Sequence, residues 1–304
     1  MDAQSSYDCE MENDDVGKSE KFEEVCDIER NILIDGHVHF HECFSLSVLL
    51  DAAADNFEAA AKSLRIDKDA CYVLLLCEDA GYKNFLGLVE KVEAKSKIDG
   101  WSFTNSSEST VVVAQHDNGR RLFIIAGRQI RTVEGLELLA LCTNFAHVDG
   151  LAVDVSIAKI QQTGGIAVLP WGFGKWSGER GKLVMRLIKA PARHGLLLGD
   201  NSGRLAGLRD PLHFRMARRV GMSILSGTDP LPFPRQQQRV GIYGSYLRGR
   251  FEESRVSTSI YSLLLEGGIT PTTYGNREQP SIFLANQLRM QVNKFCRLKG
   301  SNKR

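Results

Sequence analysis

Short apolar runs alternate with segments of helical periodicity along most of the chain. Residues 31–35 form a first apolar run that predicts a strand, and residues 47–64 then place apolar side chains every three or four positions, as an amphipathic helix does. The continuous apolar run 71–77 is bounded by charged residues, a pattern typical of a buried parallel strand. Residues 85–92 again show helical spacing.

Residues 101–142 break this alternation, because the apolar runs 111–114 and 122–126 flank Asp117-Asn-Gly, a sequence typical of a tight hairpin turn. Strand and helix patterns then resume. We expect strands at 166–169, 196–198 and 223–225 and helices near 154–162, 180–190 and 211–220. This alternation predicts an α/β fold, a parallel sheet or barrel with an early β-hairpin insertion.

Composition excludes several classes of protein. The 304 residues are 43% hydrophobic and 25% charged, as in an ordinary globular domain. No stretch approaches the roughly 18 apolar residues of a membrane span, and the acidic start is unlike a secretory or transit signal, so we expect no membrane association. The seven cysteines are scattered without a Cys-x-x-Cys pair, which favours reduced thiols and a cytoplasmic location.

Charge is unevenly distributed along the chain. Residues 1–30 hold eleven acidic and three basic side chains, and after Glu278 every charged residue is basic. We therefore expect an acidic, largely disordered segment at 1–30, a folded domain at 31–285 and a basic tail at 286–304. The basic remainder suits an anionic small molecule, but it is neither basic nor patterned enough to predict nucleic acid as a partner. The sequence leaves the oligomeric state open.

The sharpest chemical signal is Ile34-Asp-Gly-His-Val-His-Phe-His. His37 and His39 are two positions apart at the end of an apolar strand, so both rings point to the same side. Two imidazoles at that place are suited to bind one metal ion. His41 follows on the same period and is expected beside the site. The alternative is a surface cluster whose rings are satisfied by hydrogen bonds.

A second signal is Ile224-Leu-Ser-Gly-Thr-Asp-Pro, in which Asp229 follows a short apolar strand. A carboxylate at that place faces the same mouth as the end of the first strand. It is suited to bind a metal or to act as a general base on a metal-activated water. The alternative is a turn residue or a helix N-cap, which is common for Asp before Pro.

These two motifs, in this order, resemble the metal-dependent hydrolase barrels and most closely the PHP (polymerase and histidinol phosphatase) family. The segment 125–141 is similar to the stretch in which that family carries a ligand Glu on one strand and continues into a second. The resemblance implies a distorted (β/α)7–8 TIM-like barrel with a metal cluster at its C-terminal mouth. It also implies phosphoester hydrolysis with divalent Zn, Mn or Fe.

The chain departs from the PHP pattern at several ligand positions. Leu76-Cys-Glu-Asp stands where the family has Thr-Asp-His, so Glu78 or Asp79 would have to supply an oxygen ligand. Gln129 stands at the ligand Glu, and Leu169-Pro-Trp lacks the family's histidine. We therefore expect one or two ions rather than a full trinuclear cluster, held by His37, His39, Asp229 and Glu78. Asp229 or Glu78 would accept the proton of the attacking water.

Two further segments are candidate substrate-binding elements. Pro170-Trp-Gly-Phe-Gly-Lys-Trp-Ser-Gly-Glu-Arg lies between a strand and a helix, where backbone N–H groups, Lys175 and Arg180 favour an anion and Trp171 can flank a ring. The alternative is a connecting loop with packed aromatics. In Leu198-Gly-Asp-Asn-Ser-Gly-Arg, Asp200 is placed at the site rim and Arg204 on an anionic group. The alternative there is an Asx-turn.

The leading hypothesis is a metal-dependent hydrolase acting on a phosphoester or another anionic small molecule. An amidohydrolase-type enzyme cleaving C–N bonds shares the His-x-His and late Asp but usually needs two further histidines at strand ends, which this chain does not offer. A third reading is a catalytically degenerate barrel that binds an anionic ligand or a protein. Metal content separates the third reading from the other two.

Overall fold

The computed structural model describes residues 29–66, 70–146, 148–190, 195–207, 209–279, 281–286 and 288–290. The acidic segment predicted at 1–30 therefore lies outside the described residues, except for Glu29 and Arg30, which begin the first strand. Most of the basic tail predicted at 286–304 lies outside them as well. Among the described residues, no helix combines the length and the apolar composition that a membrane span requires.

The first sheet has eight strands and is built around β1 (Glu29–Val38), whose middle residues are fully buried. β1 is parallel to β2 (Ala70–Leu76), and β2 is parallel to β6 (Arg121–Ile125). The remaining pairings are antiparallel, and the β5–β6 pair is the hairpin predicted around Asp117. The sheet order is β13-β12-β1-β2-β6-β5-β4-β3, with β3 Lys97–Ile98, β4 Trp101–Asn105, β5 Val111–His116, β12 Tyr243–Arg250 and β13 Thr272–Gly275.

The second sheet has five strands in the order β11-β10-β9-β8-β7. The three predicted strands of this half, β9 (Ile166–Pro170), β10 (Leu196–Asn201) and β11 (Ile224–Gly227), are parallel neighbours. β8 (Glu137–Leu141) pairs antiparallel with both β9 and β7 (Gly127–Arg131). Each of the parallel strands is followed or preceded by a helix, as the alternating pattern predicts.

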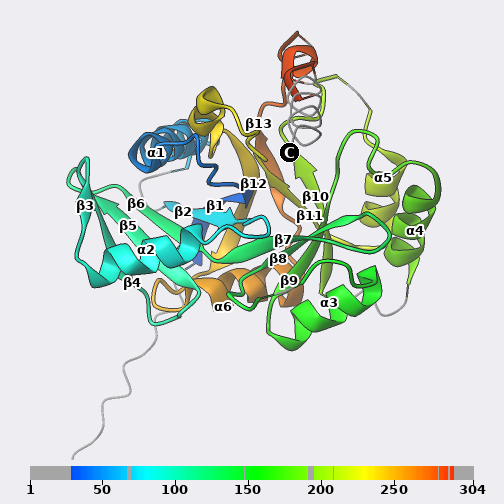
Figure 1. Cartoon of the computed structure of the whole chain (residues 1–304), viewed down its shortest axis with the longest axis horizontal. Coiled ribbons are helices and arrows are strands. Elements are labelled where there is room, and N and C mark those ends of the chain that lie inside the picture. Colours follow the sequence, from blue (N-terminus) through cyan, green and yellow to red (C-terminus); the bar gives the residue numbers. More distant parts are fainter. Residues whose placement is uncertain are drawn as a thin grey trace, which may run out of the picture.

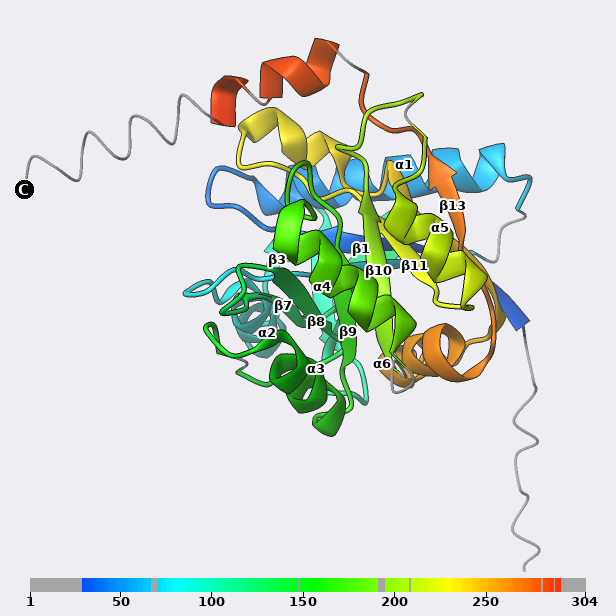
Figure 2. The same cartoon turned by 90° about the vertical axis from the view of Figure 1, so that its right-hand side faces the viewer.

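Helices cover the outer faces of the two sheets, as Figures 1 and 2 show, except for the helix Val256–Tyr261, which packs among the inward-facing core residues. The predicted helices are present, and their apolar sides pack on the strands: Phe57 meets the outer side of the first sheet, while Val184 and Phe214 pack on the outer side of the second. The helices are α1 Leu46–Ser63, α2 Asn84–Glu93, α3 Val153–Gln162, α4 Gly178–Lys189, α5 Leu212–Arg219 and α6 Val256–Tyr261, with short turns at Pro234–Arg239 (3-10) and Ser262–Glu266 (π).

The inner faces of the two sheets form one shared core. Successive strand residues point to opposite sides, so Ile32 and Ile34 face inward to join Val168 and Leu197 of the second sheet. Leu33 faces outward to α1. Burial on both faces explains why these strands appear in the sequence as continuous apolar runs.

The closed TIM-like barrel expected from the resemblance is corrected to two sheets that approach each other at two seams. At one seam β1 packs directly against β11 without a ladder of hydrogen bonds. Gly227 allows this contact, since a Cβ there would lie 2.2 Å from the His37 backbone nitrogen. At the other seam a single bridge joins Glu78 to Arg128. Among the described residues the strands thus form a mixed, barrel-like α/β arrangement that hydrogen bonds do not close.

Candidate metal centre

The C-terminal end of β1 brings two buried imidazoles together. His37 is the second-last residue of β1, and His39 is the first residue after the strand. The two-residue period of a strand therefore turns both rings to one side. Their Nε2 atoms are 2.9 Å apart, and both rings are almost fully buried. Both rings thus lie on the same side, as their spacing on a strand predicts.

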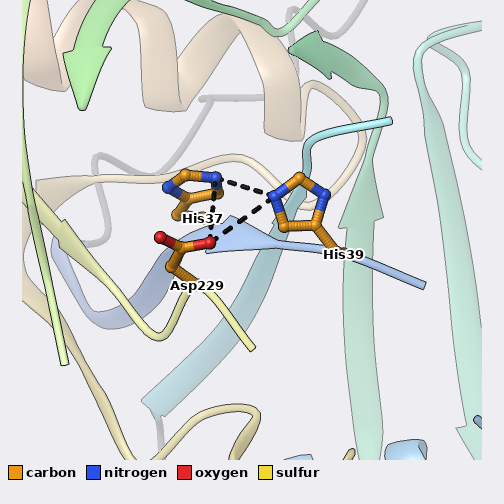
Figure 3. A group of neighbouring side chains, drawn as sticks. All are labelled: His37, His39 and Asp229. Atoms are coloured by element: carbon orange, nitrogen blue, oxygen red, sulfur yellow. Dashed lines mark hydrogen bonds and ion pairs between the residues drawn. The ribbon is translucent and has the colours of Figure 1, made fainter. Parts of the chain in front are cut away.

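Asp229 reaches the same place from the end of β11. Its backbone N–H donates to the His37 carbonyl at 2.8 Å, which ties the loop after β11 to β1. Asp229 has a φ of 50°, a left-handed conformation that aims its side chain back at the histidines. Its Oδ1 lies 3.7 Å from each Nε2, and the three ligand atoms all lie within 4.8 Å of one another (Figure 3).

A fully buried carboxylate holds the two strand ends in register. Asp35 accepts hydrogen bonds from Thr228 N at 2.7 Å, Thr228 Oγ1 at 2.5 Å and Gly241 N at 2.9 Å, and a longer one from His37 N at 3.3 Å. Burial outweighs these bonds and raises the pKa of Asp35 to about 6. This role of Asp35 was not predicted, although an Asp inside an apolar strand directly before His-x-His is a usable signal.

Asn201, the last residue of β10, fixes the orientation of Asp229. Its amide donates to Asp229 Oδ2 at 3.0 Å and to the Trp171 carbonyl at 2.9 Å. Burial by itself raises the pKa of Asp229, but the charges of His37, His39 and Lys175 outweigh it and hold that pKa below its ordinary value. Asp229 is thus kept as a carboxylate, the form that binds a cation.

His39 is supported from its other side by Asp79 and Gln129. Its Nδ1 lies 3.9 Å from Asp79 Oδ2, and Gln129 Nε2 donates to Asp79 Oδ1 at 3.1 Å. Burial, reinforced by the neighbouring His37 ring, lowers the pKa of His39 to about 4. A neutral imidazole with a carboxylate behind it is the usual form of a metal-binding histidine. Gln129 therefore positions Asp79 in this chain, although its place in the sequence suggested a weak ligand.

Lys175 and Glu137 form an ion pair, and the charges of the two residues act on Asp229 and His39. Lys175 Nζ contacts Glu137 Oε2 and lowers the pKa of Asp229, while the Glu137 charge acts on His39. The Glu137 side chain is mostly buried, whereas that of Lys175 is 42% exposed. The anion-binding role expected for Lys175 stays a prediction, and Glu137 was not singled out from the sequence.

The other predicted site residues are not part of the ligand group, although the His41 ring stacks on that of His39. Glu78 Oε1 accepts a hydrogen bond from Phe85 N at 2.7 Å at the start of α2, and it is not part of the ligand group found among the described residues. His41 Nε2 pairs with the Pro230 carbonyl at 2.9 Å. Arg180 lies at the surface and hydrogen-bonds the loop carbonyls of Gly135 and Gly174.

Asp200 and Arg204 form a buried ion network behind the site. Arg204 is 1% exposed, and its Nε and NH2 donate to the two Asp200 oxygens at 2.8 and 2.6 Å. Tyr243 OH donates to Asp200 at 2.8 Å, Arg277 lies 3.3 Å away, and Asp210 lies 3.0 Å from the remaining Arg204 nitrogen. These contacts bury both residues in a network of charges behind the site, and the substrate-binding role expected for them stays a prediction.

The ligand set fits a first-row divalent cation. Two imidazole nitrogens and one carboxylate oxygen are donors that Zn, Mn and Fe accept in proteins. The three donors converge on one place (Figure 3), with Asn201 hydrogen-bonded to the Asp229 carboxylate and Asp79 3.9 Å from the His39 ring. His37, His39 and Asp229 are therefore the residues that would hold such an ion.

Comparison with known proteins supports the fold. No protein-family model matches the chain, and no curated protein does. PsfC from Pseudomonas syringae PB-5123 is similar in structure at a TM-score of 0.54 and 12% identity, over 86% of this chain and 99% of that protein. At this identity the likeness shows a shared fold.

Two further solved structures are similar at lower scores. One is a two-domain protein from Bacteroides vulgatus ATCC 8482 that contains a predicted PHP-like metal-dependent phosphoesterase, at a TM-score of 0.44 and 11% identity over 82% of this chain and 66% of that one. The other is the lesion-specific endonuclease PfuEndoQ from Pyrococcus furiosus. Its TM-score is 0.46 and its sequence identity 11%, and the match covers 79% of this chain and 57% of that one.

Proposed function

We propose that this chain is a metal-dependent hydrolase that acts on a phosphoester or another anionic small molecule. The observation that carries the proposal is the convergence of His37, His39 and Asp229 within 4.8 Å at the ends of β1 and β11. In this proposal these residues hold one divalent ion, either Zn, Mn or Fe. The described residues contain one such group, so the second ion allowed by the sequence analysis has no separate ligand set among them.

A bound divalent ion would supply Lewis-acid polarisation of a phosphoryl oxygen and would lower the pKa of water in the site. The chain's own residues then bind and orient. Lys175 is partly exposed and its charge lowers the pKa of Asp229, so in this proposal it binds the substrate's anionic oxygens and stabilises the charge that grows on them. Arg180 and Trp171, from the same segment between β9 and α4, stay candidate contacts of the substrate.

The remaining groups position the ligands in this proposal. Asn201 orients the Asp229 carboxylate, and Asp79 with Gln129 orients the His39 ring. The role of proton acceptor stays a prediction for Asp229. For Glu78 it would require the side chain to leave the backbone N–H of Phe85, which it now caps.

The two alternatives from the sequence have less support. Amidohydrolase-type chemistry would need more histidines at the centre, and among the described residues only two share the ligand group; His147 and His194 lie outside the described residues. A non-catalytic anion-binding or protein-binding role predicts that metal is absent. The expectations of a cytoplasmic location and of no nucleic-acid partner stay predictions.

Elemental analysis of the purified protein, before and after loading with Zn, Mn or Fe, tests the proposal together with hydrolysis of p-nitrophenyl phosphate and bis-(p-nitrophenyl) phosphate. We expect close to one ion per chain and measurable hydrolysis of one of the two esters. The variant His37→Ala/His39→Ala should lose the ion and lower kcat/KM by at least about 1000-fold, because a divalent ion contributes several kcal/mol to such a reaction.

His41→Ala is the matched control, since His41 stacks on His39 yet lies outside the ligand group. It should keep the ion and most of the activity. Metal that persists in the double variant would refute the ligand assignment. A wild-type chain that takes up no metal would favour the non-catalytic alternative.

A further inference from the structure

The solvent-facing sides of α4 and α5 carry a concentration of basic side chains. On α4, Lys182, Arg186 and Lys189 follow one another at spacings of four and three, which places them on one side of the helix. The apolar residues Val184 and Ile188 on the other side are buried in the core. All three basic side chains belong to exposed residues.

α5 repeats this arrangement directly beside α4. Arg218 and Arg219 follow Arg215 by three and four positions, and all three are exposed. Phe214 and Ala217 on the other side of the helix are buried. The two helices pack against each other on the outer side of the second sheet, as Figures 1 and 2 show. We call the six residues Lys182, Arg186, Lys189, Arg215, Arg218 and Arg219 the basic face.

Most of the basic face has no acidic partner within the part of the chain that the structure describes. Lys182 pairs with Glu179 at 2.7 Å and Arg218 with Asp210 at 2.5 Å. The other four members form no ion pair there. Unpaired like charges on neighbouring helices repel one another and attract an anionic partner.

The same chain contains a segment of opposite charge. Residues 1–28 hold ten acidic and two basic side chains, whereas the chain as a whole has a formal charge of only +1. The rest of the chain is therefore strongly basic, and its excess of positive charge nearly matches the negative charge of residues 1–28. A partner joined to the same chain also has a high effective concentration, which favours it over a separate polyanion.

The topology brings this segment to the edge of the fold where the basic face ends. β1 and β11 run in the same direction, since Gly36 closely approaches Leu225 and Gly227 approaches His37. α5 leads into β11, so Arg218 and Arg219 in its last turn lie toward the edge where β1 begins at Glu29. The candidate metal centre lies at the opposite edge. A fully extended stretch of 28 residues spans at most roughly 90 Å, so its reach from Glu29 is long compared with the helices that carry the basic face.

We propose that residues 1–28 dock on the basic face of their own chain. The attraction is between carboxylates and the four unpaired cations Arg186, Lys189, Arg215 and Arg219, so it weakens as salt screens it. In this state the segment covers the strongest positive surface that the α4–α5 pair presents and keeps other polyanions from it. The proposal does not depend on the hydrolase activity.

Zero-length carbodiimide coupling of the full-length chain, followed by peptide mass spectrometry, tests this docking. The reagent joins a carboxylate to a lysine only when the two are in contact, so Lys182 and Lys189 report on the basic face. At about 0.02 M salt we expect links from residues 1–28 to these lysines, falling by at least about fivefold at about 0.5 M salt. Lys91 and Lys95, near the end of α2, should acquire few links at either salt concentration.

The variant Arg186→Gln/Arg215→Gln/Arg219→Gln removes three cations but keeps both reporter lysines. We expect it to lose links at Lys189 about tenfold at low salt, because docking depends on several charges together. The control Lys62→Gln/Arg65→Gln/Arg235→Gln removes three exposed cations elsewhere and should keep the links. Equal linking at Lys95 and Lys189, an absence of links, or links that join two copies of the chain would each overturn the proposal.

Discussion

Asp200 and Asp229 lie at the ends of adjacent parallel strands, yet their carboxylates are in opposite situations. The oxygens of Asp200 receive hydrogen bonds from Arg204 and Tyr243, with the Arg277 guanidinium beside them. Asp229 receives one side-chain hydrogen bond from Asn201 and faces two imidazoles at 3.7 Å. Position on the strand does not separate a structural carboxylate from a candidate ligand. What separates them is whether fixed cations already neutralise the charge.

The largest expected effect comes from breaking the saturated network. Arg204→Met should lower the free energy of unfolding by about 3–5 kcal/mol, because it leaves the Asp200 carboxylate buried beside fewer cations. Urea unfolding followed by circular dichroism measures this change. Metal content of the folded variant should stay unchanged, since Arg204 makes no contact with the three ligand residues.

Arg218→Met is the matched control for that prediction. Arg218 also pairs with an aspartate, Asp210, but its side chain is 54% exposed. An exposed pair contributes at most about 1 kcal/mol, so this variant should unfold close to the wild type. If Arg204→Met proved as stable as Arg218→Met but lost metal, the separation between the network and the metal centre would be contradicted.

An intermediate effect is expected at Lys175, whose ion pair with Glu137 is open to solvent. Lys175→Met should lower kcat/KM for the ester that the wild type hydrolyses by about 100-fold, which is typical for loss of one electrostatic contact to the transition state. Metal content should be retained. Steady-state kinetics together with elemental analysis distinguishes a role in binding substrate from a role in holding the metal. Lys182→Met, which removes a paired lysine at the surface, is the control.

A loss of metal in Lys175→Met with normal kcat per bound ion would give Lys175 a role in holding the centre instead. Unchanged kinetics would leave the lysine as a partner of Glu137 alone. Either result would make Lys175 a structural ion-pair partner, as Arg204 is, and would weaken the distinction between neutralised carboxylates and candidate ligands.

Much of the fold was predictable because the pattern is local. The strands β2 and β9 are apolar along their whole length, and β10 and β11 begin with apolar residues, because burial on both faces of a sheet favours that composition. β12 was missed, since its sequence Tyr-Gly-Ser-Tyr-Leu-Arg-Gly-Arg carries polar residues and glycines that allow close packing against Ile34 and Leu263. The antiparallel pairing of β8 with β9 joins segments about 25 residues apart, and a single-strand pattern does not reveal such a pairing.

The candidate metal centre was predictable where spacing alone decides geometry. His37 and His39 share a side because they are two apart on a strand, and Asp229 follows a parallel strand that ends at the same edge. Arg204 was assigned to a substrate because nothing near it in sequence shows that Tyr243 and Arg277 complete the network around Asp200. The partnership of Glu137 with Lys175 likewise joins residues from two separate elements.

The smallest expected effect tests whether the support of Asp229 matters to the metal centre. Asn201→Leu removes the amide that donates to Asp229 Oδ2 while keeping a side chain of similar size. Loss of such a supporting hydrogen bond costs about tenfold or more in metal affinity, which competition with a chromogenic chelator measures. Asn118→Leu at the hairpin turn, where the amide oxygen only accepts from Arg120 N, is the control and should bind metal as the wild type does.

An Asn201→Leu variant with wild-type affinity would show that the backbone hydrogen bond from Asp229 N to the His37 carbonyl orients the carboxylate by itself. The contrast with Asp200, whose oxygens are fixed by side chains, would then be sharper, because Asp229 would depend on the meeting of β1 and β11 alone.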